Sequence, residues 1–531
     1  MVLRRRAQWF FAEPPWNTES PKWLTLDSEL DPNHPVREIA RLTDEELKLD
    51  ALARTYSGRG TKPHMPDLLF KLALYEHSQG RVQPIQWKKD LEENKPVQWL
   101  VFGMRPSQTT LYEFRDRVAP LLQDLLGQVV QTAIDEGHTD GSCGALDGTT
   151  VAANATRHRM VNLATVEKRL EIVEREIAET EGTEEPPRLE SPTGNDGAPQ
   201  SGLVEENDTK PPAWKAKTIR GKKRQRDRYR HAQAILKAQH TNNARRRKDK
   251  RKEDAKIKVA PGDPMAPFGL DKLKTYRPLY NVQTVSDVQT DLVLAYATTR
   301  TVADSGQLLP MIERTEEITG RPVKEMLVDS GYPSGAELAQ CAEKGVIVYA
   351  PWNENTFTEM KRAKGGKKRQ IPKDRFTFDA SLPGYRCPEG KQLLYRERTT
   401  KQKADGSYFT IEIYRADPAD CTACPSKAAC VQGRSGARTV RRQENEEFIE
   451  ELQERMKTPE AKPRYRQRCC TVERRFADLK THRGLQRFSG QTPERADAQV
   501  GFTILAHNLR TLAKLRTKRS EPMPAPAKIA S

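Results

Sequence analysis

Apolar residues recur at helical spacing through the first part of the chain. Over residues 35–125 they fall at steps of three and four, which predicts amphipathic helices. Pro66 and Gly80 bracket one such segment, as expected for a first-turn proline and a terminating glycine. Thr43, with a glutamate three residues later, has the pattern of a capping box. We therefore expect an all-helical N-terminal domain at residues 1–138.

The pattern then changes from helical to extended. In residues 141–155, "GSCGALDGTTVAANA", small and β-branched residues surround Asp147 and Gly148, which predicts a short strand and its turn. From residue 274 onward two alternating segments flank a turn at Asp287–Asp291, and further strands alternate with helices. This alternation predicts an α/β sheet with helical cover.

A charged insertion separates these two parts of the sheet. Val166, Leu170, Val173 and Ile177 follow three- and four-residue steps, which is the seam of a short coiled coil. Residues 171–208 then hold 12 acids and 2 bases, a net charge of −10. Charge blocks of this kind are usually solvated or disordered interaction segments.

A basic block follows the acidic one. Residues 215–258 hold 19 bases and 4 acids, a net charge of +15, against +17 for the whole chain. Two interpretations stay open: a solvated helix neutralised by the acidic block, or a contact with the DNA backbone, where binding gains from counterion release. For the second interpretation the candidate residues are Lys222, Lys223, Arg224, Arg245, Arg246 and Arg247.

Net charge and composition narrow the class of protein. A charge of +17 and a pI near 9.4 predict attraction to polyanions, of which nucleic acid is the commonest and a membrane surface the second. No apolar run approaches the roughly 20 residues that span a bilayer, and the N-terminal segment lacks the features of a secretory signal. Eight cysteines, four of them within 387–430, do not form a disulfide framework, which indicates a reducing, cytoplasmic compartment.

Three acids attract attention by their context: Asp147, Asp329 after the apolar run "MLV", and Glu473 within a basic helix. Each alone is more often structural. Together, three carboxylates from separate elements can hold two divalent ions about 4 Å apart and clamp a phosphodiester between them. Because like charges raise one another's pKa, such a triad needs cations or metal nearby. If it exists, the three carboxyl carbons should lie within about 10 Å of one another.

Several ordered motifs resemble bacterial insertion-sequence transposases of the Asp-Asp-Glu (DDE) class, closest to the group numbered eleven-eighty-two. "HPVREIARL", "PDLLFKLALYEHSQG" and "PSQTTLYEFRDRV" are similar to an InsH-type N-terminal domain. "LDGTTVAANAT", "LVDSGYPSGAEL" and "VERRFADLKTHRGLQRFSGQ" resemble the motifs of the first, second and third acid, and "ILAHNLRTLAKL" the trailing helix. The likeness covers roughly residues 30–515, with gaps at two insertions.

The resemblance implies roles for particular residues. Asp147, Asp329 and Glu473 would together bind two divalent ions, either Mg²⁺ or Mn²⁺. Lys480 would contact the DNA near the cleaved end. A related signature, Tyr-(2)-Arg-(3)-Glu-(6)-Lys, is incomplete here, because its first two positions are Arg466 and Cys469. The nearest substitutes, Tyr465 and Arg468, are each one residue off. Arg474 and Arg475 are candidates for backbone contacts, although adjacent helical positions point in different directions.

The same resemblance implies the fold, an RNase H-like α/β core with a mixed sheet and flanking helices. The expected boundaries are a helical domain at 1–138, core segments at 139–156, 271–351 and 463–516, a charged coiled-coil insertion at 157–270, a basic cysteine-bearing insertion at 352–462, and a disordered tail at 517–531.

The clustered cysteines admit more than one interpretation. Cys387, Cys421, Cys424 and Cys430 can supply four thiolates to a structural Zn²⁺, although the first half has one cysteine where a zinc ribbon has two. The alternatives are reduced structural cysteines or a zinc site lost during divergence. The four other cysteines lack metal spacing and are expected to be packing residues: Cys143, Cys341, Cys469 and Cys470.

The expected function is therefore DNA transposition. The enzyme would cut the phosphodiester at each element end and join the 3′-hydroxyl to target DNA. Its partner is double-stranded DNA, on which it would act as a homodimer, in the bacterial cytoplasm at the nucleoid and without a membrane. The alternatives are a nuclease on the same fold, a transposase-derived DNA-binding protein without catalysis, and a basic scaffold or RNA-binding protein.

Overall fold

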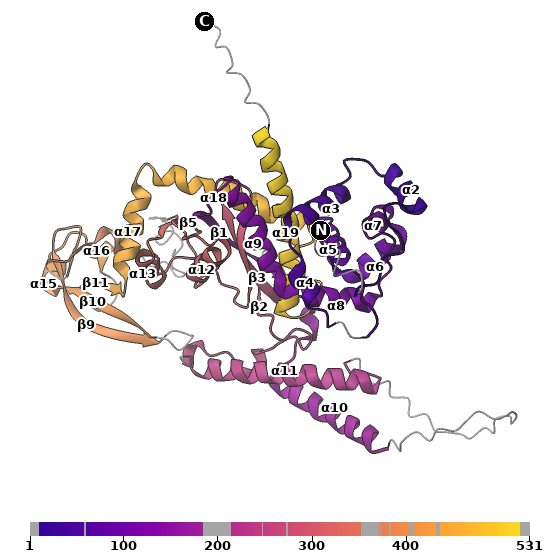
Figure 1. Ribbon diagram of the computed structural model, residues 1–531. Coiled ribbons are helices and arrows are strands. Elements are labelled where there is room, and N and C mark those ends of the chain that lie inside the picture. Colours follow the sequence, from indigo (N-terminus) through magenta and orange to yellow (C-terminus); the bar gives the residue numbers. More distant parts are fainter. Residues whose placement is uncertain are drawn as a thin grey trace, which may run out of the picture. The chain divides into compact units, whose positions relative to one another are not determined.

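The computed structural model divides the chain into two compact units, one formed by residues 1–153 and 279–531 and the other by residues 154–278 (Figure 1). The two units are described separately. The structure describes residues 10–57, 60–183, 214–246, 248–271, 274–351, 371, 373–381, 384–402, 408–431 and 436–520.

The first unit begins with helices, as predicted. They are α2 (Pro21–Glu29), α3 (Pro35–Glu46), α4 (Asp50–Arg54), α5 (Pro66–Ser78), α6 (Pro84–Glu93), α7 (Lys95–Leu100), α8 (Gln108–Val118) and α9 (Leu122–Asp135). Their apolar faces share one core with the long C-terminal helix α19 (Pro493–Ser520), which contributes Phe502, Leu505 and Leu509. The helical segment is thus packed on the end of the chain.

The predicted helix cap at Thr43 is wrong. Thr43 is buried inside α3, and its hydroxyl donates to the carbonyl of Ile39 at 2.7 Å. The helix begins at Pro35 instead, and the ring of His34 caps it by accepting from the backbone N–H of Val36 at 3.1 Å. A proline at the first helical position fixes φ for the helix, so the start lies a full two turns earlier than the capping-box pattern indicated.

A mixed sheet forms the centre of the first unit. Its strands are β1 (Cys143–Ala152), β3 (Tyr276–Asp287), β4 (Val293–Thr299), β5 (Glu325–Leu327) and β6 (Ile347–Tyr349), in the order β4-β3-β1-β5-β6. β1 is antiparallel to β3, and β3 to β4, whereas β5 and β6 run parallel to β1. The predicted turn at Asp287–Asp291 joins β3 to β4, and the helices α12 (Leu308–Thr319) and α13 (Gly335–Glu343) follow, as the sequence pattern indicated.

Asp147 and Gly148 do not form the predicted turn. β1 is continuous, and its pairing with β3 runs without a break from Gly144 to Ala152. Gly148 faces Gln283 in this register. A side chain on Gly148 would collide with that glutamine, so the glycine here serves a close approach between elements and not a chain reversal.

A second, antiparallel sheet lies within the predicted cysteine-bearing insertion, where the sequence pattern indicated no strands. It consists of β7 (Thr377–Asp379), β8 (Gly384–Arg386), β9 (Gln392–Gln402), β10 (Tyr408–Ala416) and β11 (Thr439–Gln443), with the short helices α15 (Pro418–Thr422) and α16 (Lys427–Cys430). Two helices connect this sheet to α19: α17 (Glu446–Lys457) and α18 (Ala461–Thr481).

The second unit is a helical hairpin with a small β element. α10 (Leu163–Thr183) and α11 (Ile219–Ala244) pack side by side, and Val166, Leu170, Tyr229 and Leu236 lie in their shared core. All four predicted seam positions of α10 are buried. β2 (Phe268–Leu270) pairs with the first residues of β3.

The C-terminal helix is longer than predicted. α19 extends to Ser520, past the predicted end of the core at residue 516. Residues 521–531 of the predicted tail lie outside the described residues. Residues 184–208 of the acidic block lie outside them too. No described helix is both long and apolar enough to cross a membrane.

Candidate active site

Asp147 lies in the middle of β1, where a buried arginine from α18 reaches it. Arg468 Nη2 is 2.9 Å from Asp147 Oδ1, and the exposed fractions of the two side chains are 7% and 22%. Burial raises the pKa of Asp147; Arg468 opposes this rise, and the carboxylates of Asp304 and Asp329 add to it. Asp147 therefore belongs to an acidic neighbourhood that a single guanidinium does not fully neutralise.

Asp304 lies close to Gly148, the residue that follows Asp147 in β1. Its Oδ1 accepts hydrogen bonds from Asn281 Nδ2 and Gln283 Nε2, both at 2.8 Å. A Cβ atom added to Gly148 would lie 2.3 Å from Asp304 Oδ1 and 2.3 Å from Gln283 Nε2. The hydroxyl of Tyr332 donates to Gln283 Oε1 at 2.5 Å, and burial together with Asp304 and Asp147 raises the pKa of Tyr332. These contacts fix a buried polar layer beside Asp147.

Asp329 follows β5 by two residues, at the strand end where the sequence pattern placed it. Its carboxylate is exposed, and Oδ1 accepts from the backbone N–H of Ser330 at 2.6 Å. Because Asp329 contributes to the raised pKa of Asp147, the fold brings these two acids into electrostatic contact. Tyr465 of α18 is a further neighbour of these charged groups. Burial raises the pKa of Tyr465, Arg468 opposes this rise, and Asp329 adds to it.

The third predicted acid, Glu473, lies on α18 and is exposed. Across the described residues it forms no hydrogen bond or ion pair, and no group of three or more histidine, cysteine, aspartate or glutamate side chains is arranged to hold a metal ion. Asp329 thus lies close enough to Asp147 to raise its pKa, and over the described residues no hydrogen bond or ion pair links Glu473 to either acid. Lys480, two turns further along α18, donates from Nζ to the carbonyl of Thr150 on β1 at 3.0 Å.

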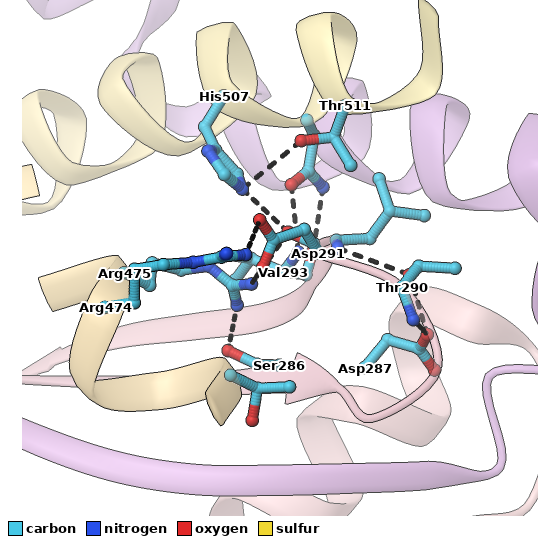
Figure 2. Close-up of polar contacts among 12 residues, drawn as sticks. Ser286, Asp287, Thr290, Asp291, Val293, Arg474, Arg475, His507 and Thr511 are labelled. Carbon is cyan, nitrogen blue, oxygen red and sulfur yellow. Dashed lines mark hydrogen bonds and ion pairs between the residues drawn. The ribbon is translucent and has the colours of Figure 1, made fainter. Parts of the chain in front are cut away.

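A second polar network fixes the position of α18 (Figure 2). Arg475 is almost fully buried, donates to the hydroxyl of Ser286, and reaches both the carbonyl and Oδ1 of Asp291 at 2.8 Å. His507 of α19 donates from Nε2 to the same carbonyl at 2.7 Å. Burial acts to raise the pKa of Asp291, but the adjacent Arg475, His507 and Arg474 outweigh it and lower that pKa.

This network bears on the two arginines predicted to contact DNA. Arg475 donates inward to the β3–β4 turn and has no exposed guanidinium to offer, so its predicted DNA contact conflicts with its burial. Arg474 points outward, with an exposed fraction of 73%, and forms an ion pair with Asp291 at 2.7 Å. The difference follows from their adjacent helical positions, which face about 100° apart.

The basic residues of the second unit fall into two groups. Lys222 pairs with Glu176 at 2.8 Å, and Lys223 with Glu181 at 2.7 Å, so both are engaged with α10. Arg224, Arg245 and Arg246 are exposed. Arg247 lies outside the described residues.

The four clustered cysteines line one cavity under the second sheet. Cys421 and Cys430 are buried, Cys387 and Cys424 are half-buried, and all four belong to the lining. Burial raises the pKa of Cys430, Arg438 opposes the rise, and the three other cysteines add to it. Of the remaining cysteines, Cys143 and Cys341 are buried as expected, but Cys469 is exposed and is not a packing residue; the side chain of Cys470 is not described.

Sequence reasoning missed three members of the Asp147 neighbourhood: Asp304, Gln283 and Tyr332. Tyr332 stands three residues after Asp329 and within the motif "LVDSGYPSGAEL", so its proximity could have been inferred. Asp304 precedes α12 in an unremarkable loop and carries no local signal. Arg468 stands out in the sequence only as an offset match to a signature, and its contact with Asp147 depends on the packing of α18 on β1.

Comparison with protein families identifies the class. Residues 386–513 match the family described as "Transposase DDE domain", and residues 24–117 match "Transposase domain (DUF772)". The first match includes Glu473 and Lys480, whereas Asp147 and Asp329 precede it. No significant match is found among curated proteins or among solved structures. Two separate segments of the chain thus match transposase families, which supports a transposase.

The pairing of these two matches in one chain supports an insertion-sequence DDE transposase with an N-terminal DUF772 domain.

Proposed function

We propose that the protein cleaves the ends of an insertion sequence and transfers them to target DNA, using Asp147, Asp329 and Glu473. One observation carries the proposal. In a chain with segments that match transposase domains, Asp329 lies close enough to Asp147 of the central sheet to raise its pKa, and each acid stands in a motif that resembles those of the transposase acids. The strand order β4-β3-β1-β5-β6, antiparallel and then parallel, supports an RNase H-like core.

The acids fit a divalent cation by donor chemistry. Asp147 and Asp329 offer the hard oxygen ligands that Mg²⁺ and Mn²⁺ prefer; the pKa of Asp147 is raised chiefly by burial and further by Asp304 and Asp329. In the structure Arg468 supplies the countercharge to Asp147, and Glu473 is separate from the pair. A bound pair of ions would activate the attacking oxygen and stabilise the leaving oxygen of the phosphodiester.

The chain's own residues then have distinct tasks. Arg468 orients the carboxylate of Asp147 and balances its negative charge when no cation is present. Tyr332 and Asp304 both bind Gln283 and thereby connect β3 to the segments after β5 and before α12. Lys480, next to Thr150 on the same strand as Asp147, contacts the DNA end. The raised pKa of Asp147 favours its protonated form at low pH, so activity should fall on acidification.

A strand-transfer assay tests the proposal. Purified protein, Mg²⁺ or Mn²⁺ and precut element ends should give joined products with a plasmid target. Asp147→Asn, Asp329→Asn and Glu473→Gln should each reduce joining at least about a hundredfold, because each removes a ligand of the metal pair. Cleavage without joining would identify a nuclease on the same fold instead.

A second candidate function has an observation in its favour. Since Glu473 is not joined to the acid pair, the chain is compatible with a transposase-derived DNA-binding protein that lacks catalysis. That protein would bind element ends with a similar Kd in all three acid variants and would yield no metal-dependent product. The matched variant is Glu494→Gln, also an exposed-helix glutamate in the DDE match, which should leave joining unchanged.

We further propose that Cys387, Cys421, Cys424 and Cys430 bind a structural Zn²⁺, and that two copies pair the element ends as a homodimer on bacterial nucleoid DNA. The common cavity of the four thiols supports the first proposal, while the structure does not hold these four described thiols in a metal-binding arrangement. Zinc content near one ion per chain, lost in the double variant Cys421→Ser/Cys424→Ser, is the expected result. Light scattering of the complex with end DNA should give two chains per pair of ends.

A further inference from the structure

The hairpin of α10 and α11 divides the charges of α11 into two sides. Within Ile219–Ala244 the helix has eight bases and one acid. On one side the bases meet α10: Lys222 with Glu176 at 2.8 Å, Lys223 with Glu181 at 2.7 Å, and Arg230 with Glu174 at 2.7 Å. These three cations are therefore paired with acids of α10, Lys222 in a largely buried pair and Lys223 and Arg230 in exposed ones.

Three arginines on the other side lack acidic partners. Arg220, Arg224 and Arg228 follow one another at four-residue steps, so they lie along one side of the helix. All three are exposed, and over the described residues none forms an ion pair. The Nε atom of Arg228 donates only to the carbonyl of Arg224, at 3.4 Å. The single acid of α11, Asp227, pairs with Arg226 at 2.9 Å.

The positive surface continues past the end of α11. Exposed bases crowd the turn that follows the helix, and hydrogen bonds hold this turn in place: Asn243 donates to the carbonyl of Lys252 at 2.7 Å and accepts from its N–H at 2.9 Å. We define the outer basic face as Arg220, Arg224 and Arg228 with the turn bases Arg245, Arg246, Lys248, Lys250, Arg251 and Lys252.

The chemistry of this face selects one kind of polyanion. The apolar residues of α11, among them Tyr229 and Leu236, are buried against α10, so the helix has no apolar side with which to enter a lipid surface. Guanidinium groups on an exposed helix bind phosphate in bidentate fashion and release counterions. No phenylalanine, tyrosine or tryptophan side chain is exposed on the helix or on the described part of the turn to stack unpaired bases, which favours a duplex.

We propose that the outer basic face binds the phosphate backbone of double-stranded DNA without regard to sequence, whereas Lys222, Lys223 and Arg230 hold the hairpin together. This inference rests on the proposed function, from which DNA is taken as the partner. It refines the expectation for the basic block by assigning DNA contact to Arg224, Arg245 and Arg246 and structural roles to Lys222 and Lys223.

The test compares two triple variants of the full chain with equal changes of charge. The outer variant is Arg220→Gln/Arg224→Gln/Arg228→Gln, and the control is Lys222→Gln/Lys223→Gln/Arg230→Gln. Binding to a random-sequence duplex is measured at several salt concentrations without divalent metal. The outer variant should reduce the slope of log Kd against log salt by about 0.9 for each phosphate that the protein no longer neutralises, or about 2.7 for all three.

The control variant should keep the slope of the natural chain to within about 0.9 and lower the melting temperature, because Glu174 and Glu181 lose their partners and Glu176 keeps only Lys215. Arg→Lys at the three outer positions should retain the slope. Equal decreases in both triple variants would show that only net charge matters. An unchanged slope in the outer variant, or a decrease seen with duplex RNA and not DNA, would likewise overturn the inference.

Failure of this inference and failure of the proposed function can be told apart. The salt slope is measured without metal and does not depend on cleavage. Asp147→Asn tests the proposed catalysis. It changes none of the bases in the two triple variants, so the difference between their salt slopes does not depend on its result.

Discussion

Two buried arginines of α18 each reach an aspartate of the central sheet region, and the two sites differ in how completely the charge is balanced. At Arg475, Asp291 receives two arginines, its backbone carbonyl is held by His507, and its pKa is lowered. At Arg468, Asp147 receives one arginine and has two further acids nearby, and its pKa is raised. The same helix therefore contacts an aspartate whose charge is balanced at one site, which we call the anchor, and an aspartate whose charge is only partly balanced at the other.

The difference separates structure from chemistry. A buried ion pair with excess positive charge has nothing to gain from a further cation, so it serves as a fixed attachment of α18 to the β3–β4 turn and to α19. An acid that retains excess negative charge can accept another cation, which is the state expected of a metal ligand before metal binds. Four sets of substitutions test this difference between the Arg475–Asp291 and Arg468–Asp147 sites.

The largest effect is expected at the anchor. Arg475→Ala removes an almost fully buried guanidinium, takes the donor from Ser286 and leaves the Asp291 carbonyl with His507 alone, which should lower the free energy of unfolding by about 3–5 kcal/mol. Arg474→Ala is the matched control on the next residue. Its ion pair with Asp291 is exposed and should cost about 0–1 kcal/mol. Urea denaturation measures both, and similar costs would mean that Arg475 is not an anchor.

The next effect concerns the close approach beside Asp147. Gly148→Ala places a methyl group 2.3 Å from Asp304 Oδ1 and Gln283 Nε2, so one of them must move, at about 1–3 kcal/mol. Gly127→Ala is the control, because the nearest atoms to an added Cβ there are 3.9 Å away and α9 should gain about 0.5–1 kcal/mol. A Gly148→Ala protein as stable as the natural chain would contradict the packing described around Asp304.

A smaller effect should distinguish the two aspartates by their response to Mg²⁺. In Arg468→Ala the acid pair of Asp147 and Asp329 loses its countercharge, so Mg²⁺ should stabilise the fold by about 1.4 kcal/mol at ten times its Kd. Arg475→Ala should show no comparable gain, because Arg474 still neutralises Asp291. Thermal unfolding with increasing MgCl₂, against matched ionic strength in KCl, measures the difference. A gain in neither variant would argue against the metal role of the acid pair.

The sequence predicted those features of the two sites that depend on neighbouring residues and missed those that depend on contacts between distant residues. Periodicity located the N-terminal helices, the Asp287–Asp291 turn and the strand-end position of Asp329, because each depends on near neighbours. It could not assign Arg475, whose partner Asp291 is 184 residues away. Adjacent arginines look alike in sequence, and only the packing of α18 shows that one is buried.

The second sheet illustrates another limit. Almost every residue of β9 is exposed, so the strand lacks the alternation of apolar and polar residues by which strands are found. Asp147 shows the opposite problem, since "DG" is a strong turn signal and the glycine instead allows Gln283 and Asp304 to approach β1. In both cases tertiary contacts, which single-sequence patterns do not contain, decide the structure.

The smallest effect is a difference in pH dependence. The folded-state pKa of Asp147 is raised, so the stability linked to its protonation is present below its unfolded pKa of about 3.9 and is lost as the pH rises through the folded value. The folded-state pKa of Asp291 is lowered, so its contribution is present above about pH 3.9 and is lost as the pH falls through the folded value. The difference in melting temperature between the natural chain and Asp147→Asn should therefore decrease with rising pH, and that for Asp291→Asn should increase. Melting curves across the acidic range test both, and slopes of the same sign would remove the distinction between anchor and acid site.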